Sequence, residues 1–358
     1  MNYTECLTNI DLELQNNFRE RKLYTRYLYK AYARLDKKGF SSPKIDFGKR
    51  HENVHSCSKF LDFGHTISGE HKLYKANFCR DKFCPMCTWR KSKKIYNQVY
   101  TCVNHVKNDY QFIMLTLTVP NVSAVELSDT IDEMNYSFTK KFTGYKSFER
   151  ICRGYIKCLE ITYNRKRDDY HPHFHVLMAV DKDYFKSDYY LKQDDFLKMW
   201  RKAMKNNNIT QVDVRKIHFN SKRPELNNIA SAVAEVAKYA VKPSDYIFTD
   251  SKILTDKVLY TFSTVLYNRR TISFCGIFYD LRKQLGFLKD INDDDDLINT
   301  DSDSEEELIN KDSFVSISRY VWFNGNYHLY ALEVPNKFVL TCSDDFFVDL
   351  RTGEILTE

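Results

Sequence analysis

Residues 170–180 read Tyr170-His171-Pro172-His173-Phe174-His175-Val176-Leu177-Met178-Ala179-Val180 and put three of the ten histidines of the chain into five positions. In an extended strand alternate side chains share a face, so the three imidazoles point to one side and Phe174 and Val176 to the other. A single histidine in a strand is usually structural, but three in alternation favour a ligand set for a divalent metal ion. His171, His173 and His175 are therefore candidate metal ligands beside a hydrophobic core.

A second strand is expected just upstream, over residues 155–163, and it carries Glu160. The polar, charged loop at 164–169 is suited to turn the chain back, so that the two strands pair antiparallel. Glu160 would then lie close to His173 or His175. The alternative is that Glu160 is an ordinary solvated strand residue.

The length of 358 residues allows one large domain or two to three small ones. No stretch approaches eighteen consecutive apolar residues, and no secretion signal opens the chain, so we expect a soluble, cytoplasmic protein. Ten cysteines in such a chain argue against a disulfide framework. Their uneven spacing favours metal binding for some of them and burial for the rest.

The formal net charge of +6 hides a strong asymmetry. Ten acidic residues and no basic residue lie between Asp290 and Glu307, so the remainder carries about +16. A basic body with a separate acidic segment is typical of proteins that bind nucleic acid. The acidic run reads as a flexible, solvated linker.

Four cysteines form a candidate structural zinc site: Cys57 stands apart, and Cys79, Cys84 and Cys87 close in a tight knuckle. Four thiolates complete a tetrahedral zinc site, and Pro85 favours the turn that brings Cys84 and Cys87 together. Reduced, partly buried cysteines are the alternative. Other nearby candidates to replace Cys57 are His55, His65 and His71.

Several further patterns predict an α+β fold with a central antiparallel β-sheet flanked by helices. A basic amphipathic helix is expected within residues 1–50 and ends near Gly39; its basic face is either solvated or in contact with DNA. A second basic helix follows the cysteine knuckle. Residues 112–119 read as a central strand, residues 184–206 favour a helix, and residues 211–217 alternate like a strand.

The alanine-rich segment 227–242 predicts a helix that Asn227 or Asn228 caps and Pro243 stops. At 100° per residue, Glu235, Tyr239 and Lys242 share one stripe of this helix. A carboxylate, a phenol and an ammonium on one face are a set suited to phosphodiester chemistry. An ordinary surface pairing at i, i+4 is the alternative.

Three segments resemble, in order, the motifs of rolling-circle replication initiators of the HUH endonuclease superfamily. They are residues 112–120, residues 171–180 and the sequence Glu235-Val236-Ala237-Lys238-Tyr239. The likeness is greatest to initiators of small Gram-positive plasmids that use one tyrosine together with a glutamate. Residues 79–90 also look like that plasmid family, and the resemblance covers roughly residues 50–247.

This resemblance implies a role for each site residue. His173 and His175 would be paired metal ligands, with Glu160 as the acidic third ligand and His171 able to replace or assist it. Tyr239 would attack a phosphodiester in single-stranded DNA, leaving a 5′-phosphotyrosine and a free 3′-hydroxyl.

The remaining roles follow the same resemblance. Glu235 would position or activate water for the terminating hydrolysis. A divalent ion polarises a scissile phosphate, which makes Mg²⁺ or Mn²⁺ the expected cofactor. Lys238 and Lys242 would hold phosphate or stabilise a phenolate. Tyr246, beyond Pro243, is the alternative nucleophile.

The expected function is therefore that of a plasmid replication initiator, with origin DNA as its partner, single-stranded at the nick. A host polymerase would extend the 3′-hydroxyl, and a host helicase is needed because no Gly-x4-Gly-Lys-Ser/Thr loop is present. A homodimer is left open, and no membrane partner is expected. The rivals are a single-tyrosine HUH transposase or a mobilisation relaxase, and, from another class, a non-catalytic zinc-dependent DNA-binding regulator.

The domain organisation expected from these patterns has five segments. They are a basic helical region (1–50), a cysteine-rich segment with a basic helix (51–110), an endonuclease and origin-binding domain (111–289), an acidic linker (290–312) and a small β-rich C-terminal region (313–358).

Overall fold

The computed structural model groups the chain into two compact units, residues 1–91 with 292–358 and residues 92–291. The structure describes residues 14–66, 71–218, 228–238, 240–287, 314–333, 347–349 and 354–356.

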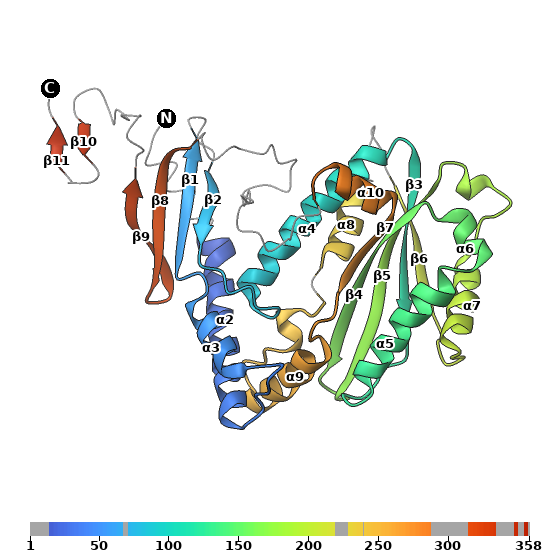
Figure 1. Cartoon of the computed structure of the whole chain (residues 1–358), viewed down its shortest axis with the longest axis horizontal. Coiled ribbons are helices and arrows are strands. Elements are labelled where there is room, and N and C mark those ends of the chain that lie inside the picture. Colours follow the sequence, from blue (N-terminus) through green and yellow to red (C-terminus); the bar gives the residue numbers. More distant parts are fainter. Residues whose placement is uncertain are drawn as a thin grey trace. The chain divides into compact units, whose positions relative to one another are not determined.

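Residues 92–291 are built on a five-stranded sheet with the strand order β6-β3-β5-β4-β7 (Figure 1). All neighbouring strands pair antiparallel. The histidine strand β5 is therefore at the centre, where its backbone bonds to a neighbour on each side. The bounds are β3 (Tyr110–Thr118), β4 (Gly154–Asn164), β5 (Asp169–Asp181), β6 (Val212–Ile217) and β7 (Ile272–Gly276).

Helices cover both faces of this sheet (Figure 1). Aromatic contacts of Phe138 with Phe174, and of Phe142 with Trp200, fill the face that carries α5, η2 and α7. The other face packs against α4, α8 and α10 through a core that includes Val99, Val233 and Phe278. The bounds are α4 (Pro85–Val106), α5 (Leu127–Ser137), η2 (Phe138–Phe142), α6 (Lys146–Ile151), η3 (Tyr184–Lys186), α7 (Gln193–Met204), α8 (Ile229–Ala237), η5 (Pro243–Asp245), α9 (Lys252–Val265) and α10 (Ile277–Gln284).

The predicted hairpin between the Glu160 strand and the histidine strand is present. β4 and β5 pair from Gly154 opposite Ala179 to Asn164 opposite Asp169. The Asn164 side-chain oxygen accepts the backbone N–H groups of Lys166 and Arg167 at 3.0 and 3.1 Å, which closes the turn. This register sets Glu160 directly opposite His173.

The other unit contains a four-stranded sheet of order β2-β1-β8-β9. Its central pair joins β1 to β8 antiparallel, with Leu61 opposite Tyr320, so strands from the two ends of the chain share one sheet. Arg319 forms a two-pronged ion pair with Asp62 across this pair of strands. The bounds are η1 (Leu14–Arg19), α2 (Glu20–Lys37), α3 (Phe47–Ser56), β1 (Phe60–Thr66), β2 (His71–Ala76), β8 (Phe314–Phe323) and β9 (Asn326–Glu333), and β10 (Phe347–Asp349) pairs with β11 (Glu354–Leu356).

The predicted N-terminal helix is confirmed, including its end. α2 ends at Lys37, and Gly39 has a φ of +75°, the left-handed conformation that favours glycine after a helix. The backbone N–H of Gly39 donates to Asp36 at 2.9 Å.

The helix expected over residues 184–206 is shorter than predicted, because α7 begins only at Gln193. The Tyr184 hydroxyl donates a hydrogen bond to the carbonyl of Leu191 and accepts one from the N–H of Leu191. These two bonds hold the intervening segment in an irregular turn. The carboxylate of Asp195 accepts the backbone N–H of Lys192 at 2.9 Å and caps the helix there.

The predicted fold class is confirmed: antiparallel sheets are flanked by helices, and a cysteine cluster is present. The predicted acidic linker lies outside the described residues, and the five segment boundaries stay a prediction. None of the described helices is long and apolar enough to cross a membrane.

Candidate active site and cysteine cluster

One carboxylate and two imidazoles meet on the face of the sheet that α8 partly covers. Glu160 Oε2 lies 2.9 Å from His175 Nε2 and 3.4 Å from His173 Nε2. A ligand atom from each residue lies within 4.8 Å of the others, and the three side chains are 4 to 11% exposed. Two imidazole nitrogens and one carboxylate oxygen, buried together, are a donor set suited to a divalent metal ion.

His171 does not join this group. It lies opposite Thr162 in the hairpin, two positions before His173, and its ring centre is 5.2 Å from that of His173. Burial lowers the pKa of His171, which keeps its imidazole neutral at pH 7. Of the two alternatives for a third ligand, the structure therefore brings Glu160 to the histidine pair and leaves His171 beside it.

Glu235 reaches the group from α8. Its Oε2 lies 3.6 Å from His175 Nε2 and 2.7 Å from Lys238 Nζ, and its side chain is about one third exposed. Ala232, Val233 and Val236 pack on the sheet below, so the buried face of α8 fixes the direction of Glu235. A second carboxylate thus stands at the open side of the site.

The predicted helix over residues 227–242 is wrong at its C-terminal end, because α8 stops at Ala237 and Lys238 is extended. The backbone carbonyl of Ala237 accepts a hydrogen bond from Ser92 Oγ, and the backbone carbonyl of Lys238 accepts one from the Cys158 thiol. Ala240 then pairs with the β4 edge, where its carbonyl accepts the Ile161 N–H at 2.7 Å. These partners outweigh the helix propensity of the alanine-rich sequence.

The start of α8 also differs from the prediction. Asn228 occupies the N-cap position, but its side chain makes no capping bond. Its amide oxygen instead accepts the backbone N–H of His218 at 2.7 Å. Asn227 lies outside the described residues.

The early end of α8 changes where the predicted stripe residues lie. Lys242 is no longer on the helix, yet its ammonium still reaches the site, with Nζ 3.0 Å from Glu160 Oε1. Lys238 contacts Glu235, so each carboxylate of the site has its own ammonium partner. Tyr239 itself lies outside the described residues.

Electrostatics keep Glu160 ionised. Burial by itself raises the pKa of this carboxyl, but hydrogen bonds with His173, His175 and Lys242 outweigh burial and hold the pKa well below its usual range. The same bond to Glu160 raises the pKa of Lys242. Glu160 is therefore a carboxylate at every pH near neutrality, ready to accept a cation.

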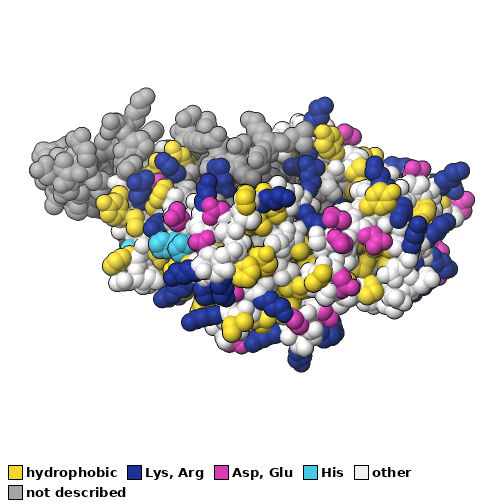
Figure 2. All heavy atoms as spheres, turned by 60° about the horizontal axis from the view of Figure 1, so that its bottom comes forward, with side chains coloured by type: hydrophobic (Ala, Val, Ile, Leu, Met, Phe, Trp, Pro, Cys, Tyr) yellow, Lys and Arg dark blue, Asp and Glu magenta, His cyan; other side chains and the backbone are white. Residues whose placement is uncertain are grey.

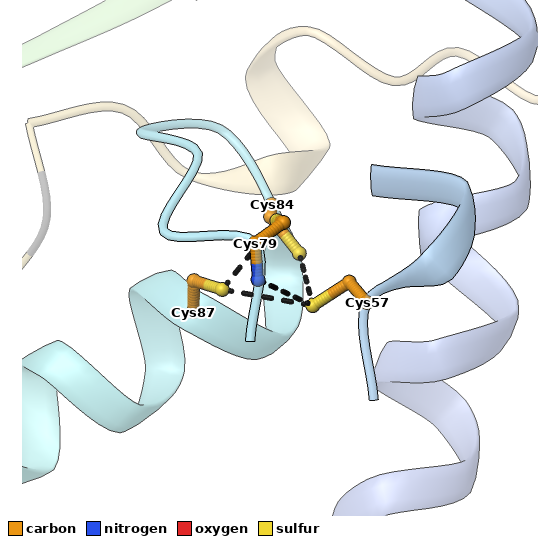
Figure 3. Close-up of side chains that lie close together, drawn as sticks. All are labelled: Cys57, Cys79, Cys84 and Cys87. Carbon is orange, nitrogen blue, oxygen red and sulfur yellow. Dashed lines mark hydrogen bonds between the residues drawn. The ribbon is translucent and has the colours of Figure 1, made fainter. Parts of the chain in front are cut away.

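The second group is formed by Cys57, Cys79, Cys84 and Cys87, whose sulfurs point toward one another (Figure 3). Cys57 follows α3, Cys79 follows β2, and the other two stand at the start of α4. The sulfur of Cys57 lies 3.7 Å from that of Cys87 and 3.6 Å from that of Cys84, and Cys79 lies 3.6 Å from Cys87. These separations exclude disulfides, whose sulfurs are about 2.05 Å apart.

The cysteine distances match a tetrahedral zinc site. With zinc–sulfur bonds of about 2.3 Å, tetrahedral ligands are roughly 3.8 Å apart. The backbone N–H groups of Cys79 and Asp81 donate to the sulfurs of Cys57 and Cys79. Burial, followed by the bonds from the other sulfurs, raises the pKa of the Cys84 thiol, so a cation is needed to hold all four as thiolates.

The three histidines considered as replacements for Cys57 lie elsewhere. His65 bonds Ser318 across the sheet at 2.8 Å, and His71 is its partner on β2. The ring of His55 packs on Tyr29. None of the three belongs to a described group of metal-binding side chains.

The sequence also matches a known protein family. A model described as replication protein (Rep_1) matches residues 70–328, well over half of the chain. This chain belongs to that family of replication proteins. The predicted resemblance to plasmid rolling-circle replication initiators is thereby confirmed.

Similar proteins carry the same description. A "Protein rep" from Staphylococcus aureus is 43% identical over 218 residues, which are 58% of this chain and 91% of that protein. One from Streptococcus pneumoniae serotype 2 (strain D39 / NCTC 7466) is 32% identical over 81% of this chain and 85% of its own length. One from Lentilactobacillus hilgardii is 33% identical over 85% and 95%. No solved structure matches this replication protein.

Two residues at the site of the replication protein, Thr116 and Asp245, were not predicted from the sequence. Thr116 of β3 lies opposite His175, with Oγ1 3.3 Å from His175 Nδ1, so it fixes the ring that faces Glu160. Asp245 has a buried carboxylate oxygen without a hydrogen-bond partner among the described residues, and burial raises its pKa to about 6. The position of Thr116 in an apolar strand is a sequence pattern that could have identified it. No local sequence pattern identifies Asp245.

Proposed function

We propose that this replication protein starts plasmid rolling-circle replication by nicking one strand of the origin and staying bound to the 5′ end through a tyrosine. The observation that carries the proposal is the buried set of Glu160, His173 and His175 beside Glu235. Such a set is suited to metal-assisted phosphodiester chemistry, and plasmid replication proteins need a 3′-hydroxyl primer. Site-specific strand cleavage supplies that primer.

Glu160, His173 and His175 are the residues that would hold a Mg²⁺ or Mn²⁺ ion. Their chemistry fits it, because Glu160 is ionised and His175 is held by Thr116 on its far nitrogen. When bound, the ion would polarise the scissile phosphate and offset the negative charge that builds on its oxygens. The ammonium of Lys242 contacts Oε1 of Glu160, and the two imidazoles face its other oxygen, Oε2.

Tyr239 is the proposed nucleophile. Its sequence neighbours Lys238 and Ala240 both bond to β4, at Cys158 and Ile161, on either side of Glu160. The phenol oxygen would form a bond to phosphorus while the bond from phosphorus to the 3′ oxygen breaks. The phenol loses its proton and the 3′ oxygen gains one, so one phosphodiester replaces another and no energy source is needed.

Two lysines and a glutamate complete the proposed reaction. Lys238 and Lys242 supply positive charge for the phosphate that enters the site. Glu235 would take a proton from water at the end of a replication round, and this water then hydrolyses a second phosphodiester. A single tyrosine is enough when a carboxylate performs that last step.

The partners follow from the proposed reaction. The substrate is origin DNA that is single-stranded at the nick, in the cytoplasm where the plasmid replicates. A host polymerase would extend the 3′-hydroxyl, and a host helicase would open the duplex ahead of it.

The test is metal-dependent formation of a covalent adduct. The full chain is mixed with end-labelled single-stranded origin DNA and Mn²⁺, and the products are separated on a denaturing protein gel. We expect a labelled, protein-sized band that EDTA abolishes and that His175→Ala reduces by at least about 100-fold. DNA binding with no labelled band under any metal would contradict the proposal and favour a non-catalytic DNA-binding regulator.

A Glu235→Gln variant is expected to separate nicking from termination. The amide cannot take a proton from water, so the adduct should still form. Hydrolysis of the second phosphodiester should slow by about 100-fold or more, and with it the release of the adduct, because the 3′-hydroxyl that this hydrolysis frees is the group that attacks the phosphotyrosine and displaces Tyr239. Pulse-chase measurement of the labelled adduct checks this, with Glu133→Gln on the exposed surface of α5 as the matched control. Adduct resolution at the normal rate would show that another group activates the water.

A further inference from the structure

A stripe of cations runs along α2 and the residue before it. Arg19, Arg26, Lys30 and Lys37 are spaced by seven, four and seven residues, which places them within about 40° of one another on a helix. All four are exposed. The stripe extends over roughly 27 Å, at 1.5 Å of rise per residue.

The core sets the direction of this stripe. Leu28, Ala31 and Leu35, on the other side of α2, are at most 1% exposed. Because that side is packed, the helix cannot turn its cations away from the solvent. The stripe is thus a rigid feature of the fold and not the product of mobile side chains alone.

Among the described residues, Arg26, Lys30 and Lys37 form no ion pair. Arginines elsewhere in the same unit do: Arg50 pairs with Asp81, and Arg319 pairs with Asp62. The two acidic residues of α2, Glu20 and Asp36, stand at its two ends. Like charges at i, i+4, as at Arg26 and Lys30, are destabilising, so this helix keeps repulsion that an anionic partner would relieve.

The neighbouring helix α3 lies beside α2 and carries the exposed cation Lys49. The rings of His51 and His55 stack at 6.1 Å, and His55 packs on Tyr29 of α2 at 4.8 Å. Residues 19–59 contain twelve lysines and arginines against four acidic residues. Figure 2 shows dark blue Lys and Arg side chains gathered beside histidines on this part of the surface.

We propose that this face of α2 binds the phosphate backbone of duplex DNA and holds the origin while the active site acts on one strand. Charge complementarity supports a nucleic acid, and the alignment of the four cations along one side of a rigid helix supports a duplex, of which 27 Å spans about eight base pairs. Single-stranded DNA is usually held by several stacking aromatics. Among the described residues of α2, Tyr27 is the one aromatic side chain more than 40% exposed. The proposal rests on the proposed function for the role of the bound duplex.

The test removes two cations without shortening the helix. Arg26→Gln with Lys30→Gln is compared with the wild-type chain by fluorescence anisotropy, on a labelled duplex of about 30 base pairs of arbitrary sequence, over a range of salt concentrations. Each phosphate contact contributes about 0.9 to the slope of log affinity against log salt. We expect the slope to fall by about two and the affinity to fall about 10-fold at low salt.

The matched control is Lys198→Gln with Lys202→Gln, an exposed pair at the same i, i+4 spacing on α7. It should leave duplex affinity and salt slope unchanged. Wild-type affinity and slope in the α2 variant would overturn the proposal, and so would an equal loss of affinity for single-stranded DNA.

Adduct formation separates this proposal from the proposed function. The α2 variant should form the covalent adduct with single-stranded origin DNA at the wild-type rate. If the wild-type chain forms no adduct while the variant still loses duplex affinity, the nicking chemistry is wrong and the duplex-binding surface stands.

Discussion

A Tyr239→Phe variant is expected to form no covalent adduct with single-stranded origin DNA and to lose nicking by at least about 10³-fold. The substitution removes only the hydroxyl that would attack phosphorus, and loss of the nucleophile from a serine protease, which also works through a covalent intermediate, costs this much or more. Fold and DNA binding should persist, because the ring is retained and the flanking bonds of Lys238 and Ala240 use backbone carbonyls. The labelled band on a denaturing gel measures the effect.

Two further tyrosines make the result decisive. Tyr136→Phe, at an exposed position of α5, should leave the band unchanged. Tyr246, the alternative nucleophile, is fully buried in the structure, which is a poor position for attack on a bound strand. A band that survives Tyr239→Phe but disappears in Tyr246→Phe would move the nucleophile to Tyr246.

Local patterns predicted the centre of this site. The alternation of His171, His173 and His175 with apolar residues indicates both a strand and the face that carries imidazoles. The polar loop before Asp169 indicates an antiparallel hairpin, and this pairing brings Glu160 opposite His173. These patterns lie within about twenty residues of one another. Hydrophobic periodicity and turn-forming residues are therefore enough to predict that Glu160 and the histidines come together.

The features that the sequence did not predict depend on distant partners. α8 ends at Ala237 because distant residues donate hydrogen bonds to the backbone carbonyls at and after its end. Ser92, Cys158 and Ile161 donate to Ala237, Lys238 and Ala240, respectively. The local sequence, rich in alanine up to Pro243, favours a longer helix. The pairing of β1 with β8 joins residues more than 240 positions apart, such as Leu61 and Tyr320. The residue pattern within β1 or β8 does not indicate which distant strand it pairs with.

A Cys84→Ser variant is expected to lose its zinc and to unfold the unit that contains residues 14–91. Cys84 is fully buried and its sulfur lies 3.6 Å from that of Cys57, so a serine there removes one of four ligands from the interior. Structural zinc contributes about 10 kcal/mol or more to the folding of small domains at pH 7. Metal analysis should give about one zinc per wild-type chain and less than about 0.1 in the variant.

The contacts around the cysteines explain why loss of zinc should destabilise other parts of the unit. The ammonium of buried Lys22, on α2, donates to the carbonyl of Cys57. The hydroxyl of Tyr327, on β9, donates to the next carbonyl, that of Ser58, at 2.8 Å. Helix α2 and strand β9 are therefore anchored to the backbone at Cys57 and Ser58. Limited proteolysis should cut both regions in the variant and spare them in the wild type.

Cys275→Ser is the matched control, because Cys275 is exposed on β7 and lies outside the cysteine group. It should retain zinc and the wild-type pattern of proteolysis. A Cys84→Ser chain that keeps a full complement of zinc, or a wild-type chain that binds none while all four thiols react freely, would refute the zinc site. The cluster would then be a set of reduced, partly buried thiols.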